Sequence, residues 1–113
     1  MVETRLTDEA LVLRQGDLVI DLARCRVLLS EHPIIPTYSE YLLLVFLATR
    51  AGYAVPKRRL LEEALGRHDP GGLRLVDEHI RHLKSKLERG SQAVIEPVGE
   101  DGYRFVRPAR HVT

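Results

Sequence analysis

Residues 73–89 carry the side chains best suited to recognise another molecule. On a helical wheel, one narrow arc of this segment is apolar and the opposite face is polar or charged. The apolar arc consists of Val76, Ile80, Leu83 and Leu87, and the opposite face carries Arg74, Glu78, Arg81, His82 and Ser85. Arginine donates paired hydrogen bonds to guanine, and glutamate accepts one from cytosine. The pattern predicts a helix that reads bases in the major groove of duplex DNA, with an ordinary solvated helix face as the alternative.

Basic side chains beside this face favour a nucleic-acid partner. Lys84 and Lys86 lie on its two flanks, where cations can approach phosphates while the outer row touches bases. A second predicted helix, residues 57–65, begins with three basic residues, Lys57, Arg58 and Arg59. Cations at a helix N-terminus oppose the helix dipole, so their presence there indicates an anionic ligand such as phosphate. A cluster that only increases solubility is the alternative for any one of the three.

The sequence offers no arrangement of residues for catalysis. It contains no Ser-His-Asp order, no glycine-rich phosphate loop and no HExxH motif. His79 and His82 are three residues apart, but no cysteine is near them and the acidic neighbours are scattered. We therefore expect no enzyme, no metal site and no cofactor.

Length and charge indicate one small domain with a locally positive region. The 113 residues include 17 basic and 16 acidic side chains, and 44% of the residues are apolar. Residues 50–89 hold ten basic and six acidic side chains (net +4), whereas residues 1–49 hold four and seven (net −3). The single cysteine excludes an internal disulfide, and neither a signal peptide nor an apolar run of ~20 residues is present. We expect a cytoplasmic domain without membrane contact and with one face suited to a polyanion.

The first third of the chain reads as strands and then changes to a helix. Short apolar runs within residues 11–35 are separated by turn signals, which predicts a four-stranded antiparallel sheet. Thr37 and Glu40 form a capping-box pattern at the start of an apolar helix that extends to Arg50. Sheet and helix together indicate the α+β class.

The remainder of the chain completes the order of a winged helix-turn-helix. The predicted helices 57–65 and 73–89 follow each other across a short loop. Strands at 93–95 and 103–106 then form a C-terminal β-hairpin, the wing, around residues 99–102. The predicted architecture is thus an N-terminal four-stranded antiparallel sheet, three helices and the wing.

Four blocks of residues, in order and at the right spacing, resemble one family. They are Thr37-x-x-Glu40-Tyr41-x-Leu43-Leu44-x-x-Leu47-Ala48, Gly52-x-x-Val55-x-x-x-x-Leu60-Leu61, Arg74-x-Val76-Asp77-x-His79-Ile80-x-x-Leu83-x-x-Lys86-Leu87 and Ile95-x-x-Val98-x-x-x-Gly102-Tyr103-Arg104-Phe105. The sequence is similar to the OmpR/PhoB-type winged-helix effector domains of response regulators. The resemblance spans residues 11–107, which leaves residues 1–10 as an N-terminal extension and 108–113 as a tail.

The resemblance implies a bacterial transcriptional regulator that binds tandem direct repeats of DNA as a dimer. It implies groove contacts from Glu78, His79, Arg81 and His82, and phosphate contacts from Arg74 and Lys84. The loop between the second and third helices would touch RNA polymerase through Arg67, His68 and Asp69. In two-component systems, which signal by phosphorelay, such a domain follows a phosphorylated receiver domain. This sequence does not contain one, and either a fragment of a longer response regulator or a stand-alone protein is compatible with it.

The wing departs from the family pattern. Members often have Thr-Val-Arg-Gly before the wing glycine, whereas this chain has Pro97-Val98-Gly99-Glu100. The threonine that would bind phosphate and the arginine that would enter the minor groove are both missing, and Glu100 and Asp101 repel the DNA backbone. His82 replaces a commonly basic residue, and Leu65 stands where an aromatic is frequent.

A winged-helix module that has lost DNA binding and docks a protein instead is the main alternative. The acidic wing and the near-neutral total charge of +1 favour it. Arg74, Lys84 and the basic cluster at residues 57–59 oppose it.

Overall fold

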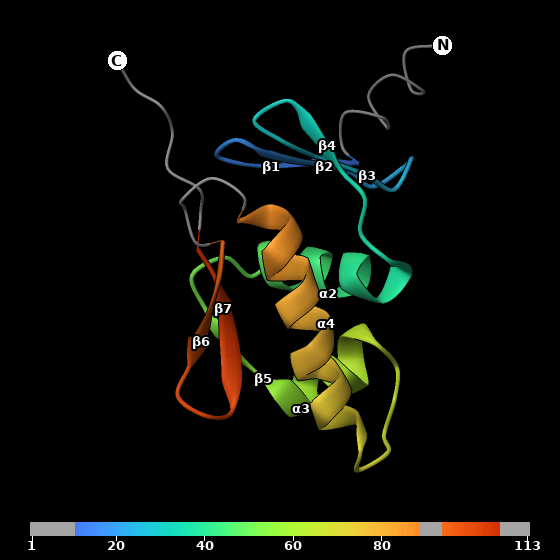
Figure 1. Ribbon diagram of the computed structural model, residues 1–113, viewed down its shortest axis with the longest axis vertical. Helices are drawn as coiled ribbons and strands as arrows, with labels where there is room; N and C mark the ends of the chain where they lie inside the picture. The colour runs from blue at the N-terminus through green and yellow to red at the C-terminus, as the bar shows by residue number, and fades with distance from the viewer. Residues whose placement is uncertain (1–10, 89–93, 107–113) are drawn as a thin grey trace.

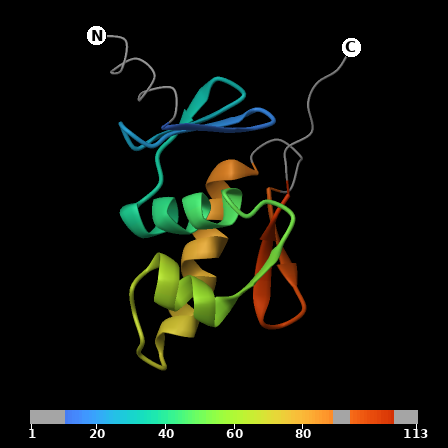
Figure 2. The ribbon, with the colours of Figure 1, turned by 180° about the vertical axis from the view of Figure 1, so that it is seen from behind.

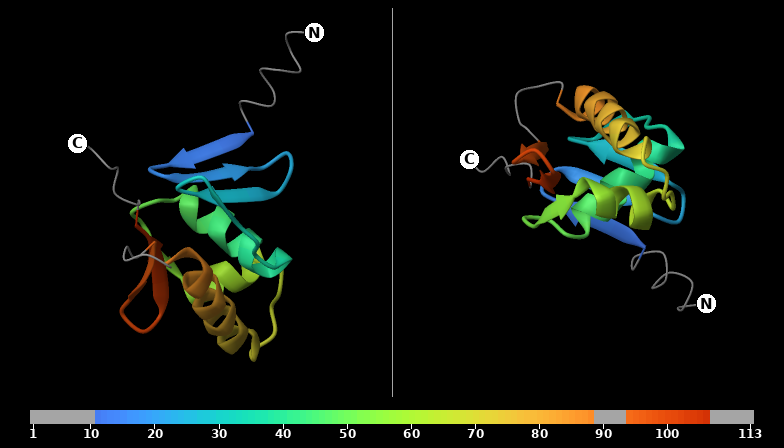
Figure 3. Two further views of the ribbon diagram at one scale, coloured as in Figure 1. Left: turned by 45° about the horizontal axis from the view of Figure 1, so that its top comes forward. Right: turned by 90° about the horizontal axis from the view of Figure 1, so that it is seen from below.

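The computed structural model describes residues 11–88 and 94–106, which form a four-stranded sheet, a helical layer and a three-stranded sheet that contains a hairpin (Figure 1). The sheet covers one side of the helices, and the hairpin stands beside them (Figures 2 and 3). The α+β winged-helix architecture predicted from the sequence is confirmed. Within the described residues, no helix combines the length and the apolar character that crossing a bilayer requires.

The N-terminal sheet is a four-stranded antiparallel meander, with each strand paired to the next along the chain. Its strands are β1 (Val12–Gln15), β2 (Leu18–Asp21), β3 (Arg26–Leu29) and β4 (His32–Ile34). Alternate residues of each strand point to the same face, so Leu18, Ile20 and Val27 are buried together on the helix side. The turn between β1 and β2 is tight because Gly16 adopts a φ of 61°.

Helix α2 (Tyr38–Ala48) begins at the predicted capping box. The Thr37 hydroxyl accepts the Glu40 amide proton at 3.2 Å, and the Glu40 carboxylate accepts the Thr37 amide proton at 3.1 Å. The helix ends two residues before the predicted Arg50, because Thr49 forms the C-cap and its hydroxyl is hydrogen-bonded to Val45 and Phe46 carbonyls.

The second helical segment is shorter and less regular than the predicted helix 57–65. It consists of α3 (Lys57–Arg59) followed by a single π-helical turn, η1 (Leu60–Ala64). Leu60 and Leu61 in this turn are buried against the other helices. An extra strand, β5 (Ala54–Pro56), precedes α3 and was not predicted, since three residues ending in proline give a weak strand pattern.

Helix α4 (Gly72–Leu87) confirms the predicted third helix with slightly different ends. It begins one residue earlier and ends at Leu87, with Glu88 as its C-cap; the predicted end at Arg89 lies outside the described residues. Gly72 allows a close approach to the preceding turn, because a Cβ there would lie 2.5 Å from Leu61 Cδ1. The helix crosses in front of α2 and begins beside the α3 segment (Figure 1).

The wing consists of β6 (Ile95–Val98) and β7 (Gly102–Phe105), and β7 lies between β6 and β5. The first wing strand therefore lies further along the chain than the predicted residues 93–95, of which Ala93 is outside the described residues. Pro97 is compatible with this strand because β6 is at the edge of the sheet. A Cβ at Gly102 would lie 2.8 Å from the Val55 carbonyl oxygen, so this glycine permits the close pairing of β7 with β5.

Candidate nucleic-acid interface

The two faces of α4 divide as the sequence predicts. Val76, Ile80, Leu83 and Leu87 are at most 1% exposed and belong to the main core. On the opposite face, Arg74, Arg81, His82 and Ser85 are exposed, while Glu78 and His79 are partly buried. Neither Arg74 nor Arg81 forms an ion pair with any residue in the described ranges, so both guanidinium groups remain available to an anionic or base ligand.

Lys84 faces the base of the wing rather than the outer row. Its ammonium group donates to the Ile95 carbonyl and pairs with the Glu88 carboxylate at 3.3 Å. The same carboxylate accepts the backbone amide protons of Val94 at 2.9 Å and Ile95 at 3.3 Å. Lys84 and Glu88 thus connect the end of α4 to β6. A DNA phosphate would have to compete with the Glu88 carboxylate and the Ile95 carbonyl for the Lys84 ammonium group.

Lys86, the other flanking lysine, pairs with α2. Its Nζ lies 2.6 Å from the Glu40 carboxylate, which is otherwise buried at 2% exposure. Burial alone would raise the pKa of Glu40, but hydrogen bonds from Lys86 and the Thr37 amide hold it below its ordinary value. The capping box of α2 thereby also anchors the end of α4.

The basic cluster at residues 57–59 does not form one surface. Lys57 points towards α4, where its ammonium group lies 3.0 Å from the Asp77 carboxylate. Arg59 instead lies over the ring of Phe46 on α2, at 5.6 Å, and pairs with Glu63 at 3.0 Å. Arg58 is exposed and lies 3.9 Å from Glu62. Among the described residues, Lys57 is thus the one cation of this cluster that pairs with a side chain of α4.

The Asp77 carboxylate joins three elements that are distant in the sequence. Its Oδ1 accepts a hydrogen bond of 2.6 Å from the Tyr103 hydroxyl on β7, and both its oxygens approach Lys57 on α3. Burial and this hydrogen bond raise the pKa of Tyr103 well above its ordinary value. Lys57 also lies 5.6 Å from the centre of the Tyr103 ring, in the range of a cation–π contact.

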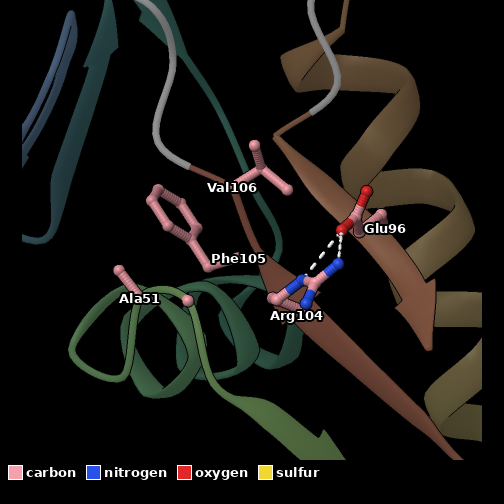
Figure 4. Close-up of a pocket in the computed structure, with 6 residues that line it drawn as sticks. Ala51, Glu96, Arg104, Phe105 and Val106 are labelled. Atoms are coloured by element: carbon pink, nitrogen blue, oxygen red, sulfur yellow. Dashed lines mark hydrogen bonds and ion pairs between the residues drawn. The ribbon is translucent and has the colours of Figure 1, made fainter.

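The tip of the wing has the opposite charge to α4. Glu100 and Asp101 are exposed there, as the sequence suggests. The cation of the two wing strands, Arg104, donates to the Glu96 carboxylate from the opposite strand (Figure 4). This pair lines a pocket of about 460 Å³ with Gly52 and Phe105, next to the end of α2. The wing therefore presents carboxylates at its tip and a neutralised arginine on its side.

The loop before α4 carries the residues expected to touch RNA polymerase. Arg67, His68 and Asp69 are all exposed, and the Arg67 guanidinium forms two hydrogen bonds of 3.0 Å to the Asp69 carboxylate.

His79 and His82 were considered above as metal ligands. Within residues 11–88 and 94–106, no group of three or more potential metal ligands includes them or any other residue.

A family model described as "Transcriptional regulatory protein, C terminal" matches residues 31–105. The cell cycle response regulator CtrA of Brucella anthropi is 34% identical over 99 residues, which cover 86% of this chain and 43% of that protein. The chain belongs to this family. It spans less than half the length of the curated relatives that it matches.

Solved structures of OmpR/PhoB regulators have the same fold. The response regulator DrrB, a Thermotoga maritima OmpR/PhoB homologue, is 29% identical with a TM-score of 0.75, covering 92% of this chain and 49% of that chain. The Klebsiella pneumoniae RstA DNA-binding domain, solved in complex with the RstA box, is also 29% identical with a TM-score of 0.75, covering 84% and 96%. The resemblance to OmpR/PhoB domains is confirmed, and this is a family of transcriptional regulators rather than enzymes.

Three carboxylates of this OmpR/PhoB domain have roles that the sequence did not reveal. Asp77, Glu88 and Glu40 each bridge α4 to another element, through contacts that span up to 46 residues. Helical spacing shows which side chains share a face of one helix, but it carries no information about partners on another element. For Asp77, the one sequence signal of such a contact was its position on the helical wheel, at the border between the apolar arc and the polar face.

Proposed function

We propose that this domain binds duplex DNA in a sequence-specific manner, with α4 in the major groove, as the effector domain of a bacterial transcriptional regulator. The observation that carries the proposal is the outer face of α4. It presents two exposed arginines, Arg74 and Arg81, that pair with no carboxylate of the described residues, on a helix whose opposite face is buried in the core. A rigid helix with exposed arginines fits the major groove, where arginine pairs with guanine. The RstA domain, whose structure contains its DNA box, supports the same assignment.

The predicted contacts fall into two groups in this proposal. Glu78, His79, Arg81, His82 and Ser85 face the bases, and Arg74 faces a phosphate. Lys57 and Lys84 reach phosphates only by leaving their carboxylate partners, whereas Arg58 and Arg59 lie further from the groove and contribute to the surrounding field. The domain thus relies on a few strong contacts from one helix.

The wider context of the domain follows from the family. We infer that residues 11–107 form the DNA-binding unit of a longer cytoplasmic protein, consistent with the 43% of CtrA that this chain covers. Binding to direct repeats as a dimer would double the limited contact area of one domain. The exposed loop with Arg67, His68 and Asp69 is the proposed contact with RNA polymerase.

Protein docking without DNA binding is the competing function, and the acidic wing tip favours it. The outer face of α4 argues against protein docking, because docking alone would not require exposed arginines there. The two functions differ in how binding depends on salt, since DNA binding releases counterions from phosphates.

A fluorescence-anisotropy titration tests the proposal. The first step selects duplexes from a random-sequence pool, and the second measures the affinity of the winning duplex and of a scrambled duplex at several salt concentrations. We expect saturable binding to the selected duplex, with log K falling linearly by about 0.9 per phosphate contact per tenfold rise in salt. Failure to enrich any sequence, together with no saturable binding at low salt, would favour the docking function instead.

A further inference from the structure

A surface pocket of about 610 Å³ separates the wing tip from the first turn of α4. Leu73 and Arg74 line it on the helix side, and Glu100 and Asp101 line it on the wing side. Open space cannot fix the distance between two elements. Their relative position must therefore be set by the contacts at the edges of the pocket.

The polar contacts between the described parts of α4 and the wing lie at two places. At the base of the wing, Lys84 and Glu88 hold the start of β6. Towards the tip, the polar contact is the hydrogen bond from the Tyr103 hydroxyl to Asp77, beside the pocket. The hairpin is also paired with β5 through β7, and Ile95 and Phe105 pack in the same core as α4. The Tyr103–Asp77 bond adds a direct polar attachment to α4 near the wing tip, which fixes the angle of that part of the wing to the helix.

Asp77 also holds the start of α3. Its carboxylate pairs with Lys57, whose backbone amide donates to the Asp101 carbonyl at 2.6 Å. The start of α3, the wing tip and α4 thus meet around one side chain. Asp77 is 43% exposed and Lys57 only 22%, so the lysine is the better enclosed partner and is held away from the solvent.

We propose that Asp77 is a positioning residue for DNA recognition, which sets the angle between the wing and the recognition helix and withholds the Lys57 ammonium group from DNA phosphates. This inference rests on the proposed DNA binding. It assigns to Asp77 an effect on specificity without any contact with a base. A carboxylate near the DNA backbone weakens non-specific binding, because it neutralises a nearby cation.

Two conservative variants separate the two roles of Asp77. Tyr103→Phe removes the hydrogen bond to the wing but leaves the Asp77–Lys57 pair intact. Asp77→Asn keeps the side-chain shape and an acceptor for Tyr103 but removes the charge that holds Lys57. Two matched controls make the same chemical changes elsewhere: Tyr53→Phe on a tyrosine that is 74% exposed, and Asp21→Asn on a carboxylate that pairs with Arg24 on the sheet side.

The measurement is the ratio of affinities for the duplex selected from the random pool and for its scrambled version, together with the salt dependence of each. We expect Tyr103→Phe to lower this ratio about fivefold to tenfold, the net effect of one ordinary intramolecular hydrogen bond. Asp77→Asn should lower it by a similar factor and steepen the salt dependence by about 0.9, because Lys57 gains access to a phosphate. Adding Lys57→Met to Asp77→Asn should restore the original slope.

A structural readout without DNA distinguishes a failure of this inference from a failure of DNA binding. Hydrogen exchange of the β6 and β7 amides should accelerate in Tyr103→Phe while the amides of β2 and β3 remain unchanged. If wild-type protein binds no duplex specifically, DNA recognition fails and the positioning role fails with it, whatever the exchange shows. If wild type binds specifically but both Asp77→Asn and Tyr103→Phe match their controls, the positioning role alone is overturned.

Discussion

The two sides of helix α2 are built from different kinds of contact. Strands β1 to β4 cover one side, where each strand pairs with its neighbour in the sequence and apolar side chains fill the space below. Helix α4 and the wing lie on the other side, where charged side chains pair across long stretches of sequence. Cations without such partners are exposed there as well. Buried apolar side chains stabilise both sides. We infer that recognition is confined to the α4–wing side.

The largest expected effect on recognition comes from Arg81→Ala. Loss of a bidentate contact with guanine should weaken binding to the selected duplex by about 1–3 kcal/mol and relax the preference at one base position. Anisotropy titration against duplexes that vary at each position measures both effects.

Arg14→Ala is the matched control, since Arg14 is exposed on the sheet side. Its affinity should equal that of wild type, and the free energy of unfolding should change by less than about 0.5 kcal/mol in both variants. If Arg81→Ala retained its affinity and its base preference, recognition would not occur through α4.

The second effect concerns the ion pair that connects the two sides. Lys86→Met leaves the Glu40 carboxylate buried without its ammonium partner, which should lower the free energy of unfolding by about 1–2 kcal/mol. This is less than for a fully buried pair, because the Lys86 side chain is 35% exposed. Urea unfolding measures the change, and Arg58→Met, which breaks a pair 3.9 Å apart on the surface, should cost less than about 0.5 kcal/mol.

The same pair predicts a dependence of stability on pH. The folded-state pKa of Glu40 lies below its ordinary value of 4.5, so the folded protein binds its proton less readily than the unfolded chain. The contribution of Glu40 is therefore fully present above that value and is lost as the pH falls through the folded-state pKa. Glu40→Gln should show a weaker loss of stability between neutral and acidic pH than wild type. Equal losses in the two proteins would exclude a contribution from Glu40.

The sequence predicted the sheet side more completely than the α4–wing side. Alternating apolar residues determine which face of β2 is buried, and the capping box at Thr37 locates the start of α2, because both signals act within a few residues. The apolar stripe of α4 was equally readable from its helical period. Such local patterns are enough to predict the fold and to predict which side chains of α4 are exposed.

The remaining features depend on contacts between distant residues. Lys57 and Lys84 have the residue type and position of phosphate ligands, yet each is held by a carboxylate from another turn or element. The irregular turn at Leu60–Ala64 follows from packing against α2 and α4, which no local propensity encodes. Sequence patterns therefore identified the cations, but they did not show which of them already pair with a carboxylate of the same domain.

A smaller effect is expected at the wing tip. Glu100→Lys should strengthen binding about fivefold to both the selected and the scrambled duplex and steepen the salt dependence by about 0.9, since it replaces a repulsive charge by a phosphate contact. Anisotropy titrations at several salt concentrations measure this change. Glu31→Lys makes the same change of charge on the sheet side and should have little effect. Equal behaviour of the two variants would show that the wing does not approach DNA.

The smallest effect lies in the turn between β3 and β4, on the sheet side. Ser30 and Glu31 form this two-residue turn with φ values of 50° and 68°, a conformation that costs residues other than glycine about 1 kcal/mol or more. Glu31→Gly removes that cost but increases the entropy of the unfolded chain, so we expect a net gain of about 0.5 kcal/mol in the free energy of unfolding, measured in urea.

Glu100→Gly provides the opposite case on the α4–wing side. Glu100 has no left-handed backbone conformation to relieve, so glycine there brings only the entropic cost and should lower the free energy of unfolding. Affinity for the selected duplex should not change in Glu31→Gly, because the turn lies at the top of the sheet, far from the first turns of α4 (Figure 1). A stabilised Glu31→Gly variant with altered DNA affinity would show that the sheet is coupled to recognition, and the division between the two sides of α2 would then be wrong.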